Sequence, residues 1–328
     1  MADFRLTIPV VFIIFNRPDT AVRVFAEIKK VRPSKLYLVS DAARDGREEE
    51  REKVGKCRHL IESMIDWDCE VIRDYAIKNM GCKNRVSSGI SGALKNEESV
   101  IILEDDVVPS PDFFPFMQQM LTEYRYEEKI MMVSGTNLLR DYKIKGDYTF
   151  SFFSSIWGWG TWNRAWMRYY DPEMKDWADI ENKKRLRKVY RNPLAFALFK
   201  KDADIVYNGG KDTWDLQWDY CRMKRGALGI VPASNMINNI GFDREDATHT
   251  TGMSFEDFSY GTMHIPCGSV RPIEENLSYD KAYIKKYMGL RRIVNAVRKK
   301  LSTGHWNPSK KYESTTSTER SINNGQGH

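Results

Sequence analysis

The chain has 328 residues, of which 41% are hydrophobic and 29% are charged, so it is long enough for one large or two modest domains with a sizeable core. Its net charge is +6 and the excess gathers near the C-terminus, which does not fit a duplex nucleic-acid binder with basic clusters on several elements. No apolar run is long enough to predict a membrane-spanning helix, and the five cysteines form no C-x-x-C pair. Neither a disulfide framework nor a structural zinc site is expected, and a reducing cytoplasm fits best.

The first half of the chain alternates between strand and helix patterns. Strands are expected at 7–15, 35–40, 69–72 and 99–103, and helices at 17–31, 46–65 and 85–94. The first strand is a short β-branched run without a small-residue cleavage site, so it is not read as a signal peptide. This alternation predicts an α/β fold with right-handed crossovers and a mostly parallel sheet. Ligands of such sheets bind outside the carboxyl ends of the strands.

The pattern is less regular in the second half. Helices are expected at 111–124, 158–170, 175–189 and 212–224, and strands at 130–135, 148–153 and 228–232. Seven of the nine tryptophans lie between Trp157 and Trp218, which indicates either a sugar-facing surface or a bulky core.

The C-terminal part carries most of the excess positive charge. Residues 281–301 contain eight Lys or Arg and no acid, with apolar residues largely on one helical face. Such a helix either lies on an anionic membrane surface or packs on the domain with a solvated basic face, and both readings stay open. Residues 302–328 are polar and are expected to be disordered.

The sharpest feature is the acidic triplet Glu104-Asp105-Asp106, directly after the expected strand 99–103. Like charges at close range raise each other's pKa, and a divalent cation relieves that repulsion. Hard Mg²⁺ or Mn²⁺ prefers oxygen ligands and fills its remaining positions with water and substrate phosphates. The alternative is an acidic turn that caps the following helix, although Asp112 is placed to serve that purpose instead. The metal reading is favoured because the triplet stands where α/β sheets bind ligands.

Other phosphate-binding signatures are missing. There is no G-x-G-x-x-G after the first strand and no Walker A sequence, and 208–213 lacks the hydroxyl after its Lys. A dinucleotide dehydrogenase or a P-loop ATPase is therefore not expected. A nucleotide bound without a glycine cradle, through a metal at an acidic strand end, points to a sugar-nucleotide transferase.

Six stretches make the similarity to a known family specific. They are FNRPDTAVR (15–23), LVSDAARDG (38–46), NMGCKNRVSSGISGAL (79–94), VIILEDDVVPSPDFFPFM (100–117), FFSSIWGWGTWNRAW (152–166) and TWDLQWDYCRM (213–223), with a weaker match at NNIGFDREDATHT (238–250). Over roughly residues 7–255 the chain resembles GT-A fold glycosyltransferases of the type of N-acetylglucosaminyltransferase I and its bacterial relatives. The triplet followed by V-x-P-x-x-x-F-F is the most specific part.

The resemblance implies roles for individual residues. It places a nucleotide-contacting cation at Arg17 and at Arg85, and a contact to uracil or ribose at Asp41. Glu104 and Asp105 match residues that bond sugar and ribose hydroxyls. The direct carboxylate ligand of Mn²⁺ falls at Asp106, and the general-base region falls at Asp215.

The base needs separate consideration, because Asp215 and Asp219 lie four residues apart on one helix face. A carboxylate beside Trp214 and Trp218 is partly desolvated, so its pKa should rise, which suits a general base. Asp215 lies between the two tryptophans and is preferred, while Asp219 stays open. Asp212 is expected to cap the same helix.

Two further features can each be interpreted either as part of the site or as an ordinary structural feature. His249 lies in a polar stretch that runs to about Met263, and it either donates to a diphosphate from a closing loop or is merely exposed. The run WGWGTW at 157–162 either stacks against a sugar ring or forms a packed turn in the core.

Together these observations predict a GT-A type, Rossmann-like sheet flanked by helices, with a helical C-terminal extension. Residues 1–135 form the nucleotide-sugar-binding half and 136–265 the acceptor and catalytic half of one domain; 266–301 form the basic helical region and 302–328 the tail. The expected activity is inverting, metal-dependent transfer of a sugar, best assigned as N-acetylglucosamine, from a UDP-sugar to a glycan acceptor.

The expected cofactor is Mn²⁺ or Mg²⁺, and no nucleic-acid partner is expected. A lipid-linked glycan at the inner face of a membrane is the suggested acceptor, with the protein cytoplasmic or peripheral at that face. A sugar-phosphate nucleotidyltransferase and a non-catalytic carbohydrate- or membrane-binding module are the alternatives.

Overall fold

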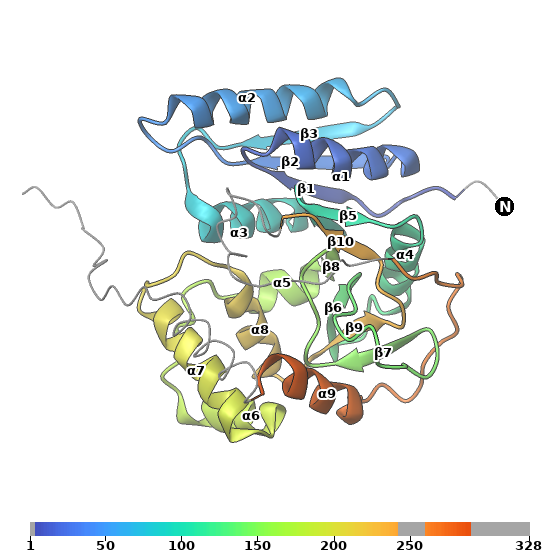
Figure 1. The fold of residues 1–328 in the computed structure, drawn as a ribbon, viewed down its shortest axis with the longest axis vertical. Coiled ribbons are helices and arrows are strands. Elements are labelled where there is room, and N and C mark those ends of the chain that lie inside the picture. Colours follow the sequence, from blue (N-terminus) through green and yellow to red (C-terminus); the bar gives the residue numbers. More distant parts are fainter. Residues whose placement is uncertain (1–3, 242–259, 290–328) are drawn as a thin grey trace, which may run out of the picture. The chain divides into compact units, whose positions relative to one another are not determined.

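The computed structural model describes residues 4–241 and 260–289 (Figure 1). The strands are β1 (Val10–Ile14), β2 (Lys35–Ser40), β3 (Glu70–Tyr75), β4 (Ser99–Glu104), β5 (Val107–Pro109), β6 (Ile130–Ser134), β7 (Tyr148–Ser151), β8 (Trp159–Trp162), β9 (Leu228–Pro232) and β10 (Ile237–Asn239). The helices are α1 (Pro18–Val31), α2 (Glu48–Ser63), α3 (Gly81–Leu94), α4 (Phe113–Glu123), α5 (Asn163–Tyr169), α6 (Ile180–Tyr190), α7 (Pro193–Tyr207), α8 (Asp215–Met223) and α9 (Leu277–Tyr287).

The central feature is one mixed sheet. Within the described ranges it contains eight strands in the order β3-β2-β1-β4-β8-β6-β9-β7. Strands β7 and β8 run antiparallel to their neighbours, and the other six point the same way. All five residues of β1 are buried, as expected of a strand that is covered on both faces. The prediction of an α/β fold with a mostly parallel sheet flanked by helices is confirmed.

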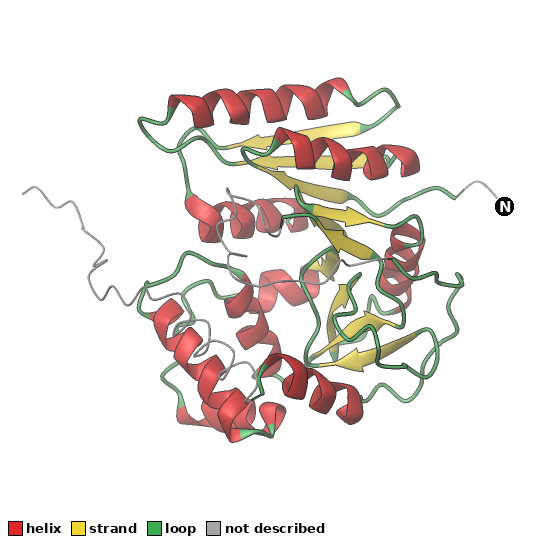
Figure 2. Ribbon diagram, viewed as in Figure 1, coloured by secondary structure: helices red, strands yellow, loops and turns green. Residues whose placement is uncertain are grey.

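Helices cover both faces of the first part of the sheet. Helices α1 and α2 pack together on one side of β1, β2 and β3, and α3 lies on the other side (Figures 1 and 2). Helix α1 starts at Pro18, whose fixed backbone suits a first turn, and it buries Ala21, Val24, Phe25 and Ile28 as one stripe. Helix α3 sits close to β2, because a Cβ on Gly89 would lie 2.5 Å from Val39 Cγ1. Its many small residues allow this close packing.

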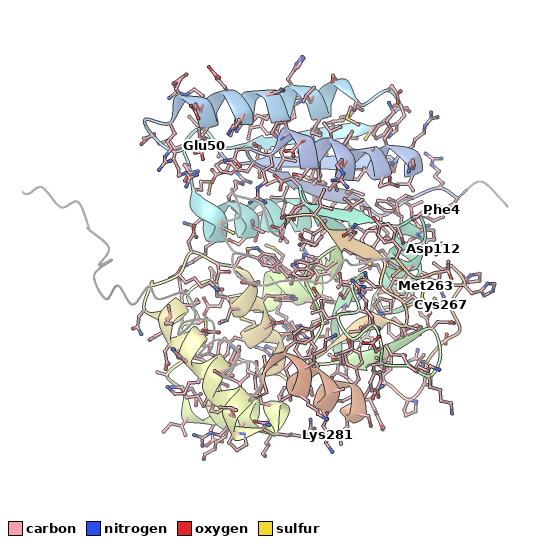
Figure 3. The ribbon with its side chains drawn as sticks, in the orientation of Figure 1. Phe4, Glu50, Asp112, Met263, Cys267 and Lys281 are labelled. Atoms are coloured by element: carbon pink, nitrogen blue, oxygen red, sulfur yellow. The ribbon has the colours of Figure 1, made fainter. Side chains whose placement is uncertain are left out.

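The second part of the sheet is covered by α4 and α5, and α6, α7 and α8 pack against one another. The chain after residue 260 runs along α4 (Figure 3). Met263 donates its amide to Asp112 Oδ2 at 3.0 Å, and Cys267 and Gln119 exchange two hydrogen bonds of 2.8 Å. Asp112 stands at the N-cap position of α4 without a side-chain cap bond. The expected capping by Asp112 is therefore wrong, since its carboxylate accepts from Met263 instead.

The basic C-terminal segment is described only up to Gly289, and 290–301 lie outside the described residues. Helix α9 packs on β7 and buries Tyr279 and Ile284, while the Tyr283 ring stacks at 4.9 Å on a neighbouring phenylalanine. For this part of the segment, the apolar face is used for packing on the domain. Within the described ranges, no helix is both long and apolar enough to cross a membrane.

Several expected elements need correction. The expected helix 158–170 is a strand in its first part, because β8 inserts between β4 and β6 and only α5 is helical. Trp159 and Trp162 are fully buried there, so the core reading of WGWGTW holds for both rings. The expected helix at 175–189 begins only at Ile180, and α7 was not expected at all.

Candidate active site

The acidic triplet lies at the point in the sheet where the strand order reverses. From β1 the chain adds β2 and β3 on one side and then returns to place β4 on the other side of β1. The parallel strands β1 and β4 therefore end side by side, which brings Glu104, Asp105 and Asp106 next to Phe15 and Arg17. Such a switch point leaves a crevice outside the strand ends, where open α/β sheets bind ligands.

The three acids make different contacts. Asp105 is buried and accepts the Phe15 amide on Oδ2 at 3.1 Å, so it ties the end of β4 to the end of β1. Asp106 Oδ2 lies 3.2 Å from Arg17 Nη1, and both side chains are largely shielded, with 18% and 13% exposed. The Arg17 guanidinium therefore offsets part of the triplet's negative charge. The resemblance implies a different partner for this cation, the bound nucleotide.

Glu104 shows how much negative charge gathers here. Its pKa is raised to about 8, first by burial and then by the neighbouring carboxylates Asp106, Asp105 and Asp215, while Arg17 opposes the shift. A carboxyl group with such a pKa marks a place where added positive charge would be strongly stabilised.

The oxygen donors of the triplet fit a hard divalent cation. Within the described residues, however, no group of three or more His, Cys, Asp or Glu side chains could hold a metal ion. Asp106 and its neighbours would therefore hold Mn²⁺ or Mg²⁺ only together with water or substrate phosphates, which is how Mg²⁺ sites in phosphate-binding enzymes are commonly built.

A second chain segment closes against Asp106. Strand β10 pairs with β5, and the Ile240 amide continues this ladder with a 2.8 Å bond to the Asp106 carbonyl. A Cβ on Gly241 would lie 2.1 Å from Asp106 Oδ2, so any larger residue there would have to displace the Asp106 carboxylate. The chain that leads to His249 thus starts beside the triplet, although His249 itself lies outside the described residues.

Asp215 comes to the same site from the opposite half. It begins α8, its carboxylate accepts the Thr213 hydroxyl, and its charge acts on Glu104. Asp219 instead pairs with the fully buried Arg222 at 2.6 Å, and burial raises the Asp219 pKa. Of the two candidate bases, Asp215 is the one whose charge acts on Glu104, and its hydrogen-bond partner Thr213 is a residue that sequence reasoning missed.

The start of α3 links the two halves of the site. Asp41 accepts the amides of Met80 and Gly81, and Asp212 accepts those of Cys82 and Lys83, both at 2.8 Å. Two carboxylates therefore satisfy four consecutive amides at the positive end of the helix. The expectation that Asp212 caps α8 is wrong, because it reaches across to α3.

Asp41 and Arg85, which the resemblance implies as nucleotide contacts, are bonded to other groups of the protein. Burial raises the pKa of Asp41, and the backbone amides that donate to its carboxylate oppose this rise. Both carboxylate oxygens accept hydrogen bonds, from the amides of Ala42 and Gly81 among others. Arg85 is buried and pairs with Asp74 on β3. The structure therefore brings Arg17, the triplet and Asp215 together, and it holds Asp41 and Arg85 beside them in structural contacts.

A cluster of tryptophan rings packs against the start of α8, which carries Asp215. Trp214 stacks on Trp159 at 5.5 Å and 17°, and Trp166 lies 5.0 Å from Trp218. All four rings are at most 2% exposed. The concentration of tryptophans in the second half thus forms a rigid core that fixes the beginning of α8.

No protein-family model matches the chain, and no curated protein matches it in sequence. Among solved structures it is similar to S. aureus TarS, with a TM-score of 0.33 and 10% identity over 48% of this chain and 47% of that chain. GalNAc-T7 with UDP, GalNAc and Mn²⁺ gives a TM-score of 0.40 and 12% identity over 70% and 43%. A UDP-glucose pyrophosphorylase complexed with UDP-glucose gives 0.25 and 12% over 44% and 63%. The chain spans less than half the length of the first two, and at these TM-scores the case for a function rests on its own residues.

Proposed function

We propose that the chain is an inverting, metal-dependent glycosyltransferase of the GT-A type that transfers a sugar from a UDP-sugar, best assigned as UDP-N-acetylglucosamine, to a glycan acceptor. The observation that carries the proposal is the gathering of the triplet, Arg17 and Asp215 at the β1/β4 switch point. The site offers carboxylates for a cation and for sugar hydroxyls, and a separate carboxylate that can act as a base.

The residues divide the work of transfer. Asp106 would hold the metal ion, which when bound supplies Lewis-acid neutralisation of the diphosphate. Glu104 and Asp105 offer acceptor oxygens to donor hydroxyls. Asp215 accepts the proton of the attacking hydroxyl while that oxygen bonds to the anomeric carbon and the bond from this carbon to UDP breaks, with the electron pair leaving on UDP. Thr213 orients the base by its hydrogen bond.

The metal assignment is tested with Asp106→Asn, which keeps the shape and removes the charge. Calorimetry with UDP-N-acetylglucosamine, with and without Mn²⁺, should show metal-dependent binding in the natural protein and a marked loss in the variant. Unchanged, metal-independent binding in the variant would overturn the assignment.

The base is tested with Asp215→Asn against the matched change Asp219→Asn on the same helix. Donor binding should stay nearly intact in Asp215→Asn, while kcat falls by roughly 10²–10⁴, the usual worth of a general base. Asp219→Asn should retain most of kcat, because Asp219 pairs with Arg222. The opposite result would move the base by one helical turn.

The competing activity is separated by the product formed. A sugar-phosphate nucleotidyltransferase releases pyrophosphate from UTP and a sugar phosphate, whereas a glycosyltransferase slowly releases UDP from the UDP-sugar alone. A non-catalytic module does neither. UDP release that depends on Mn²⁺ and on Asp215 would support only the proposed function.

The acceptor is proposed to be lipid-linked and the protein to lie at an anionic membrane surface inside the cell. Lys281, Lys285 and Lys286 of α9 are exposed beside its packed apolar residues. Each such cation near anionic lipid contributes about 1 kcal/mol, screened as salt rises. Exchanging Lys285 and Lys286 for Glu should weaken sedimentation with anionic vesicles at low salt; equal sedimentation would remove α9 from the membrane proposal.

A further inference from the structure

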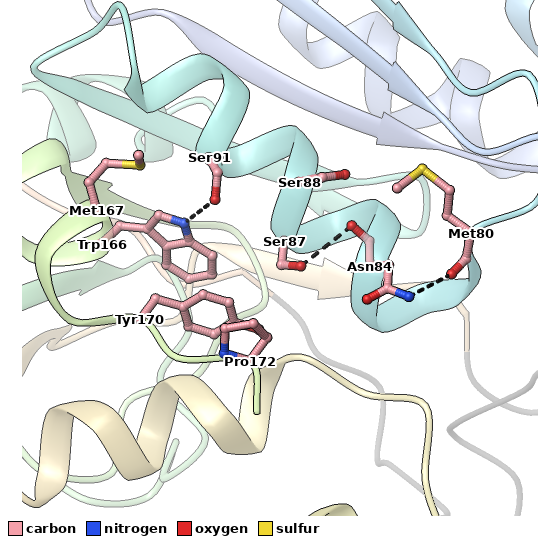
Figure 4. A pocket seen from close by; sticks show the side chains of 9 residues that line it. All are labelled: Met80, Asn84, Ser87, Ser88, Ser91, Trp166, Met167, Tyr170 and Pro172. Atoms are coloured by element: carbon pink, nitrogen blue, oxygen red, sulfur yellow. Dashed lines mark hydrogen bonds between the residues drawn. The ribbon is translucent and has the colours of Figure 1, made fainter. Parts of the chain in front are cut away.

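A groove lies between α3 and α5, apart from the triplet. It has a volume of about 460 Å³ and is open along one side. One face of α3 and the end of α5 with the turn after it supply its lining (Figure 4): Met80, Asn84, Ser87, Ser88, Ser91, Trp166, Met167, Tyr170 and Pro172. No Asp, Glu, Lys, Arg or His is among these nine residues, so the groove suits an uncharged ligand.

The polar groups of the groove present mainly oxygen lone pairs. Ser87 and Ser88 donate their hydroxyl hydrogens to carbonyls of their own helix at 2.6 and 3.1 Å, and Asn84 Nδ2 does the same at 3.2 Å. Ser91 Oγ accepts the indole N–H of Trp166 at 2.9 Å. Ser87 also hydrogen-bonds Tyr170, so the Ser88 hydroxyl oxygen and the Asn84 amide oxygen are the main acceptors for a ligand that brings its own donors.

The other wall is apolar and rigid. The partly exposed Tyr170 ring stacks at 3.9 Å and 11° on the buried Trp166 ring, and Met167 of α5 leaves 40% of its surface exposed, while Met80 at the start of α3 leaves 38%. Apolar and aromatic surface beside a few fixed polar groups is the usual make-up of a small-molecule site. A sugar ring matches it, because its C–H face packs on apolar groups while its hydroxyls donate to the serine and amide oxygens.

One residue of the groove wall contacts the segment that carries the proposed base. Tyr170 donates its hydroxyl to the Trp214 carbonyl at 3.3 Å, and Trp214 directly precedes Asp215. The Asp215 charge also acts on the Tyr170 hydroxyl. Tyr170 is therefore both part of the groove wall and in contact with the segment that carries the proposed base.

We infer that this groove binds the glycan acceptor, as an uncharged oligosaccharide, and this inference rests on the proposed function. A phosphate is disfavoured because no cation lines the groove. An acyl chain would cover the oxygens of Asn84, Ser87 and Ser88 without supplying donors, which is costly for buried acceptors.

The experiment is saturation-transfer NMR of the full chain with chitobiose, cellobiose, maltose and decyl maltoside, the last below its micelle concentration. Ser88→Trp fills the groove, and Asn84→Ala removes one exposed acceptor with little risk to folding. Ser63→Trp is the matched control, because Ser63 is an exposed helical serine on α2 that also donates to the carbonyl three residues before it.

At least one neutral saccharide should receive saturation from the natural protein and from Ser63→Trp. Its affinity should fall by about tenfold or more in Ser88→Trp and measurably in Asn84→Ala, while calorimetric UDP binding with Mn²⁺ stays unchanged. The inference is overturned if no saccharide binds, if both groove variants bind normally, or if saturation reaches only the acyl protons of decyl maltoside. The experiment measures saccharide binding and not transfer. If the protein shows no transferase activity, the proposed function is refuted, while the binding of a saccharide in the groove is still tested.

Discussion

Replacing Asp212 with Ala should damage catalysis far more than stability. Its carboxylate accepts two amides at the start of α3, and it lies three residues before Asp215. Losing an N-cap Asp costs about 0.5–2 kcal/mol, and Asp212 is exposed, so water partly replaces it and about 1 kcal/mol is expected. For a domain of this size that lowers Tm by about 2–4 °C. A shift of Asp215 by about 1 Å, in contrast, can lower kcat by about 10²-fold.

The matched control is Asp179→Ala. Asp179 is likewise an exposed N-cap residue, on α6, and accepts the Glu181 amide at 2.7 Å. Both variants should melt a few degrees below the natural protein, and only Asp212→Ala should lose kcat, with the KM for the donor little changed. Asp212→Asn, which keeps one acceptor oxygen, should lie between. If Asp212→Ala melts like Asp179→Ala and keeps full kcat, the contact to α3 does not position the base.

The remaining predictions concern a close approach and a buried acid. Gly241→Ala should weaken Mn²⁺-dependent UDP binding, because its Cβ would strike the Asp106 carboxylate; Gly55→Ala, in open space on α2, should leave binding alone and stabilise the helix by about 0.5–1 kcal/mol. Titration calorimetry and urea unfolding check both, and normal binding by Gly241→Ala would refute the packing argument. Asp280 is a buried residue of α9, and its pKa is raised to about 7 from an ordinary 3.8, chiefly by burial. The folded state therefore favours the protonated acid, so stability should fall as pH rises from about 4 to about 7, and Asp280→Asn should flatten that slope in urea unfolding at pH 5 and pH 8. An equal slope in both proteins would refute it.

The early part of the fold could be predicted because its signals are local. The apolar run of β1, the stripe of α1 and the acids after β4 each depend on residues close in sequence. The resemblance implied a cation near the nucleotide at Arg17, and the rule that parallel strands end at one edge accounts for its position beside the triplet. These features predicted the mostly parallel sheet and the acids at its edge, whereas the strand order was not predicted and the roles of Arg17 and Asp215 were expected from the resemblance.

The errors arose where distant residues decide the structure. Helix α3 begins at Gly81 rather than Arg85, because carboxylates from Asp41 and Asp212 satisfy its first amides. The periodic pattern of apolar residues within the helix does not indicate such a contact with distant residues. Strand β8 was read as helix because a four-residue segment buried on both faces has no visible period. Helix α7, in contrast, carried a readable start in Asn192, which caps it, followed by Pro193 at its first turn.

The occupied N-terminus of α3 bears on how a nucleotide diphosphate can be held. A free helix N-terminus is a ready anion site, since its amides and its dipole favour negative charge. Here the amides from Met80 to Lys83 already serve Asp41 and Asp212, so this helix offers no open cradle. The chain also lacks a glycine-rich phosphate loop after β1. Among the described residues, we therefore expect Arg17 and a cation at the proposed Asp106 site to meet most of the charge of a diphosphate, and we expect UDP affinity to depend steeply on the divalent metal for this reason.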